Sequence, residues 1–142
     1  MSDQTLRLIA GVVLLAHGLG HGGALGAFIW IRARPGTDTG GWRAARSWLL
    51  PDLAPDTAML IASACWIVAL VGFVLAAVSF SGLAFPDAWR PLAVGCAIVS
   101  LAGIGLFAGT WPLFNTVAAV AVNVAVLVAV LVLRWPGAAP LA

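Results

Sequence analysis

The residues whose types and spacing suggest chemistry are two histidines, His17 and His21, which stand four positions apart near the start of the chain. On a helix, side chains at this spacing differ by about 40° in azimuth and lie about one turn apart, so both imidazoles can face one interior site. The spacing suits two metal ligands on one helix face, and imidazoles can also hydrogen-bond to an organic ligand. The pair is therefore the first candidate for a functional site.

The element that carries this pair is predicted to cross a membrane. Hydrophobic residues make up 63% of the 142-residue chain and charged residues only 8%, a balance that a soluble surface could not cover. A bilayer crossing needs about 20 predominantly apolar residues, and four stretches qualify: approximately 6–31, 57–79, 91–109 and 113–133. Because lipid offers the backbone no hydrogen-bond partner, the sequence predicts an all-α, polytopic four-transmembrane-helix bundle that forms a single membrane domain over residues 1–142.

The loop between the first two spans, residues 32–56, carries four of the seven arginines. The positive-inside rule therefore predicts a cytoplasmic loop, with both termini outside. Wound as a helix, residues 41–50 would place Trp42 and Leu49 on one side and Arg43 and Arg46 on the other. This pattern favours a short helix in the headgroup plane, and an ordered loop anchored by Trp and Arg is the alternative.

Tryptophans indicate where the spans end, because Trp prefers the headgroup layer of a membrane. Trp30, Trp89, Trp111 and Trp135 fall at predicted span ends, whereas Trp66 lies inside the second span. We therefore expect the first four at the membrane surface.

Small residues predict which helix faces pack together. Gly18, Gly22 and Gly26 repeat every four residues in the first span, and Ala121, Ala125 and Ala129 do the same in the fourth. Such stripes let helix backbones approach closely in lipid, and a stripe left over from packing within the bundle would serve a homo-oligomer contact. The alternative for the five glycines between positions 18 and 26 is a local unwinding of the helix.

Partners for the histidines are few in the predicted spans. Asn115 and Asn123 in the fourth span are the strongest neutral hydrogen-bonding candidates, and Ser63 and Ser100 are weaker ones. An ionisable side chain at membrane depth is costly unless it meets a partner or water. We therefore expect an interior polar site of His17, His21 and Asn123, with Asn115 near the membrane edge.

Four interpretations of this site stay open. The polar side chains could simply hold helices together, or they could hydrogen-bond to a quinone or another lipophilic molecule. A metal site would use both histidines, with Cys65 or Cys96 as a soft third ligand. Haem held by two histidines would require a second protomer, since both histidines are on the first span.

The opening segment, residues 6–18 (LRLIAGVVLLAHG), is similar to the first helix of DoxX-like small membrane proteins. An Arg, a Gly and a later His-Gly pair recur there, which here would be Arg7, Gly11, His17 and Gly18. The chain departs from that pattern after His-Gly, where a Lys usually follows but His21 and further glycines occur. The resemblance covers the first helix and implies a four-helix membrane protein of a family linked, as a subunit, to quinone-associated redox complexes.

These features together predict an accessory or small-molecule-binding subunit of a membrane complex that carries no cofactor of its own. It would not act as an enzyme alone, because no nucleophile, base and orienting group come together in the sequence. The first alternative is a membrane oxidoreductase component that binds quinone, haem or metal at His17 and His21. The second is a structural homo-oligomer packed through the glycine stripe. Expected partners are the lipid bilayer and a membrane protein or further copies, and no basic stripe suggests nucleic acid.

Overall fold

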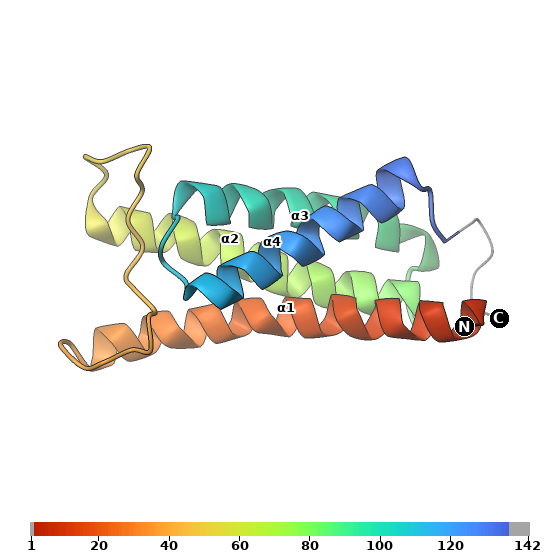
Figure 1. The fold of residues 1–142 in the computed structure, drawn as a ribbon, viewed down its shortest axis with the longest axis horizontal. Coiled ribbons are helices and arrows are strands. Elements are labelled where there is room, and N and C mark those ends of the chain that lie inside the picture. Colours follow the sequence, from red (N-terminus) through yellow and green to blue (C-terminus); the bar gives the residue numbers. More distant parts are fainter. Residues whose placement is uncertain (1, 137–142) are drawn as a thin grey trace.

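The structure, a computed structural model, describes residues 2–136 and confirms an all-helical membrane bundle. Its elements are α1 (Asp3–Ala33), α2 (Pro55–Phe80), η1 (Pro86–Ala88), α3 (Trp89–Leu106), α4 (Leu113–Leu127) and η2 (Val128–Val132), as Figure 1 shows. The π-helical turn η2 continues α4, and the 3-10 turn η1 leads into α3. The four helical segments are each long and apolar enough to cross a membrane.

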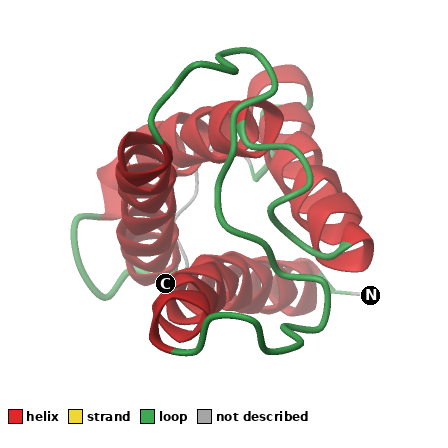
Figure 2. Cartoon of the chain, turned by 90° about the vertical axis from the view of Figure 1, so that its left-hand side faces the viewer, coloured by secondary structure: helices red, strands yellow, loops and turns green. Residues whose placement is uncertain are grey.

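The helices pack in chain order, α1 on α2, α2 on α3 and α3 on α4. Consecutive helices run antiparallel, and α4 runs obliquely across the bundle in Figure 1. Seen along its length in Figure 2, the bundle arranges its helices around a common interior. Two grooves lie between α1 and α4 and are lined by side chains of both helices.

Glycines mark the closest approaches between helices. A Cβ at Gly18 would lie 3.0 Å from Phe73 Cβ, so α1 meets the backbone of α2 there. On the other side of α2, a Cβ at Gly103 would lie 2.8 Å from the Trp66 ring. Gly103 stands outside the predicted stripes, but it brings α3 onto α2 by the same close-packing effect.

The two predicted stripes have different surroundings. Beyond Gly18, the glycine stripe loosens, because a Cβ at Gly22 would only touch Leu70 at 3.7 Å and one at Gly26 would meet nothing within 4 Å. In the fourth span, Ala121 and Ala125 of α4 are exposed and Ala129 of η2 is half-buried. A homo-oligomer built on either stripe stays a prediction.

The possible unwinding of the first helix at its glycines is wrong. The α1 helix is continuous from Asp3 to Ala33. Gly18 is buried against α2, so close packing explains at least this glycine. The histidines consequently keep regular helical spacing.

The interfacial helix expected over residues 41–50 is also wrong. Residues 42–47 are not helical, because their backbone bonds to other elements. The Arg43 amide donates to the Thr110 carbonyl at 2.9 Å, and the Ala45 amide donates to Met59 Sδ at 3.1 Å. The loop therefore lies across the end of the bundle, as Figure 2 shows.

The third span ends earlier than the predicted residue 109, since α3 stops at Leu106. The chain turns through Gly109, whose φ of +84° suits glycine, and the Thr110 hydroxyl donates to the Phe107 carbonyl at 2.7 Å. This turn directs Trp111 inward, where only 8% of it is exposed. Trp111 therefore stands at the end of a span, as predicted, but it packs inside the bundle and does not face outward.

Candidate ligand-binding site

Four polar side chains from three helices form a chain of hydrogen bonds inside the bundle. His17 Nε2 on α1 lies 3.1 Å from Asn123 Oδ1 on α4. Asn123 Nδ2 donates to Ser100 Oγ on α3 at 2.7 Å, and Ser100 Oγ lies 3.2 Å from His21 Nε2. The structure thus brings His17, His21 and Asn123 together, with Ser100 as the link between Asn123 and His21.

The chemistry of the amide gives this chain a direction. An amide oxygen only accepts hydrogen bonds, so His17 Nε2 carries the hydrogen that reaches Asn123. The Asn123 amide then donates to Ser100. If the Ser100 hydroxyl donates in turn to His21 Nε2, the hydrogen of that imidazole sits on Nδ1. The hydrogen-bond chain then runs from His17 at one end to the donor His21 Nδ1 at the other.

Aromatic rings enclose His21. Its ring stacks on Trp66 with centroids 5.8 Å apart and lies 5.3 Å from the Trp111 ring. Trp66 and Trp111 contact each other at 4.8 Å, and His17 meets Phe73 edge to face at 4.7 Å. Residue types and spacing do not predict that these aromatic residues belong to the site, although the position of Trp66 inside a span is a signal.

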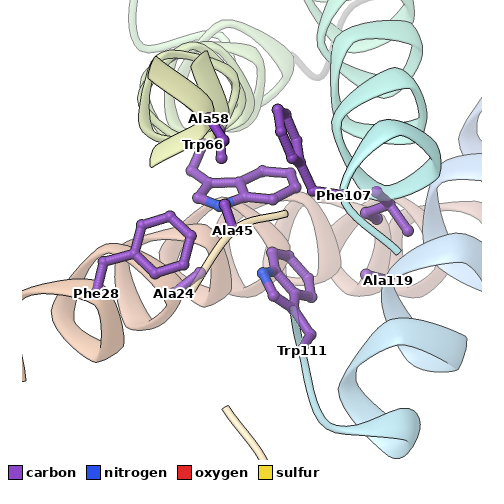
Figure 3. Close-up of a cluster of buried hydrophobic side chains, with 10 residues drawn as sticks. Ala24, Phe28, Ala45, Ala58, Trp66, Phe107, Trp111 and Ala119 are labelled. Atoms are coloured by element: carbon purple, nitrogen blue, oxygen red, sulfur yellow. The ribbon is translucent and has the colours of Figure 1, made fainter. Parts of the chain in front are cut away.

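Three buried nitrogens in this aromatic cluster have no hydrogen-bond partner among the described residues: His21 Nδ1, Trp66 Nε1 and Trp111 Nε1. Figure 3 shows both indole nitrogens on the side of Ala24 and Ala45. Buried polar groups almost always find a partner, and one left without costs about 1–3 kcal/mol. The cluster is therefore rich in donors and poor in acceptors.

A groove between α1 and α4 passes these residues. Its volume is about 270 Å³, and His17, His21, Trp111 and Asn115 contribute to its lining, together with Trp42 from the loop. His17 is half-buried there, whereas Asn115 is exposed on the α4 wall. Asn115 therefore belongs to the groove but not to the chain of hydrogen bonds.

The described residues do not fit a metal or haem site within one protomer. Residues 2–136 contain no group of three or more His, Cys, Asp or Glu side chains that could hold a metal ion. Cys96 instead packs against Gly72, and its thiol donates to the Val68 carbonyl at 3.6 Å. The two imidazoles meet edge to face with centroids 5.0 Å apart, so a planar macrocycle has no room between them.

Comparisons with protein-family models, curated proteins and solved structures find no match to this chain. The resemblance of the first helix to DoxX-like proteins stays a prediction.

Proposed function

We propose that this protein binds a lipophilic small molecule with carbonyl or hydroxyl oxygens, such as a quinone, in the groove between α1 and α4. It would do so as a subunit of a larger membrane complex. The observation that carries the proposal is the lining of the groove, to which His17 contributes beside His21 and Trp111, two residues whose buried ring nitrogens His21 Nδ1 and Trp111 Nε1 have no hydrogen-bond partner among the described residues. Ligand sites commonly combine such apolar walls with a few convergent polar groups.

The histidines and tryptophans would have separate roles in binding. The hydrogen bond from His17 Nε2 to Asn123 fixes the imidazole and leaves Nδ1 to accept from a ligand hydroxyl. A ligand oxygen at the inner wall would lie beside His21, whose Nδ1 has no hydrogen-bond partner among the described residues. The site would therefore recognise a neutral head group with oxygens and would not need a metal.

A second candidate function is structural. The hydrogen-bond chain connects α1, α3 and α4 through His17, Ser100 and Asn123, and polar side chains hold helices together in lipid. In that case the groove would be a consequence of helix packing, and removal of His17 would change stability without changing ligand binding.

We also propose an orientation and a setting for the bundle. The loop over residues 32–56 would face the cytoplasm, with both ends of the chain outside, because the loop carries four arginines and the opposite side three. The resemblance to DoxX-like proteins supports a role as a subunit beside a redox partner. The exposed Ala121 on α4 leaves an apolar face for such a partner or for a second copy.

The experiment that tests ligand binding uses purified protein in detergent, analysed by native mass spectrometry with a decyl-substituted benzoquinone kept in its reduced quinol form, whose hydroxyl groups can donate to His17 Nδ1. We expect one quinol per chain, and we expect His17→Leu to weaken binding about tenfold, equivalent to about 1.4 kcal/mol. His17→Gln keeps a hydrogen-bonding side chain and should lose less. The absorption spectrum and an organic extract of the untreated protein would show any molecule that copurifies.

Two outcomes would contradict the proposal. The wild-type protein could fail to bind the quinone, or His17→Leu could bind it as well as the wild type does. If His17→Leu also unfolds more readily while binding is unchanged, the structural role is the better account.

A further inference from the structure

The polar groove continues into an apolar one. A second groove of about 310 Å³ also lies between α1 and α4, and it reaches from Leu6 on α1 to Trp135 beyond α4. Val13 and Val122 line both grooves. The two are therefore neighbouring sections of one long depression, with the histidines in one section and only aliphatic or aromatic side chains in the other.

The joined groove is long. On α1 it runs from Leu6 to His21, about 22 Å along the axis at 1.5 Å per residue. Since Val13 and Val122 line both sections, a single extended molecule can occupy the two sections together.

Small side chains make the apolar section hollow. Ala10 and Ala93 contribute to its lining from α1 and α3, and Ala125 of α4 and Ala129 of η2 line it from the fourth span. The alanine stripe of α4 thus has a local use, because larger residues at Ala125 and Ala129 would fill the space between α4 and α1. Ala121, one turn before Ala125, is exposed outside both grooves.

We infer that the joined groove binds a single amphiphile, with a neutral hydrogen-bonding head beside His17 and one long hydrocarbon chain in the apolar section. This inference rests on the proposed function and specifies the class of ligand. Lipid is as apolar as the groove, so transfer of the hydrocarbon chain out of the membrane adds little, and close packing of the hydrocarbon chain along the groove supplies its share of the affinity. The apolar section acts by shape, since it holds the chain in line with the head and fixes the direction in which the head enters.

The test compares substitutions of two exposed alanines on α4, each measured with two ligands. Ala125→Phe fills the apolar section, and Ala121→Phe adds the same ring outside it. The ligands, both in the reduced quinol form, are the decyl-substituted benzoquinone and the same quinone with a methyl group in place of the decyl chain. Binding is measured by native mass spectrometry, and a thermal melt reports whether each variant is folded.

We expect Ala125→Phe to weaken binding of the decyl quinone about tenfold or more and to leave binding of the methyl quinone unchanged. Ala121→Phe should bind both quinones as the wild type does. If Ala125→Phe does not fold, Ala129→Phe fills the same section from the next turn and replaces it.

The possible failures separate the two proposals. If the filled variant binds the decyl quinone normally while His17→Leu does not, the hydrocarbon chain of the ligand lies elsewhere. The assignment of the head group to His17 then stands. If the filled variant loses both quinones equally, the substitution disturbs the head site and the role assigned to the apolar section is wrong. If the wild type binds neither quinone, the proposed function fails and this inference fails with it.

Discussion

Asn123 holds the centre of the hydrogen-bond chain because its two amide atoms serve different partners. The oxygen accepts from His17 and the nitrogen donates to Ser100, and the whole side chain is buried. An isosteric apolar residue would leave polar atoms of both neighbours without their partner inside the bundle. Asn115, on the same helix, is exposed on the groove wall.

The substitution Asn123→Leu should therefore destabilise the fold by about 1–2 kcal/mol. Asn115→Leu is the matched control and should leave the free energy of unfolding nearly unchanged. Unfolding in mixed micelles of increasing SDS content measures both. Equal stability of the two variants would show that the hydrogen-bond chain contributes little to the fold.

The sequence was sufficient to identify the histidines and Asn123, because few polar side chains occur in the predicted spans and helical spacing puts His17 and His21 on one side. It was not sufficient to identify the enclosing tryptophans. Trp111 lies inside because the chain turns inward after α3, and Trp66 contacts it only through the packing of α2. The position of Trp66 depends on the rotation of α2 and that of Trp111 on the turn after α3. Residue types alone determine neither.

At the scale of elements, the α2–α3 contact determines where Trp66 lies. Gly103 faces the Trp66 ring and Cys65, with no space for a side chain. Spacing patterns indicate that small residues help helices approach, but Gly103 belongs to no regular stripe. The loop over residues 34–54 also departs from what its spacing pattern predicts. Its amphipathic pattern is typical of a surface helix, but its backbone hydrogen-bonds to Thr110 and Met59.

Gly103→Ala should push the Trp66 ring away from its position and destabilise the protein by about 1–3 kcal/mol. The control is Gly105→Ala on the same helix, where a Cβ would meet nothing within 4 Å. Alanine is the better helix former by about 1 kcal/mol, so the control should be neutral or slightly stabilising. Thermal unfolding and the near-UV circular dichroism of tryptophan measure both effects. An unperturbed spectrum for Gly103→Ala would show that the ring can shift without cost.

The whole molecule has two unequal ends. One end carries the long loop, which packs over the α3–α4 turn through bonds such as the one from Trp48 Nε1 to the Gly105 carbonyl at 2.6 Å. The other end carries the start of α1 and the turn between α2 and α3, as Figure 1 shows. Four crossings follow from span length and composition alone, whereas the closure of one end by the loop depends on tertiary contacts.

The orientation of these ends can be tested with cysteines in place of exposed residues. Thr37 lies in the long loop and Ser81 lies in the turn at the opposite end, and both are exposed. Because the loop carries more arginine, we expect an impermeant maleimide to label Ser81→Cys in intact cells and Thr37→Cys only in inverted vesicles. The wild type is the control, since Cys65 and Cys96 lie within α2 and α3. The opposite labelling pattern would place the loop outside and contradict the orientation that the arginine count predicts.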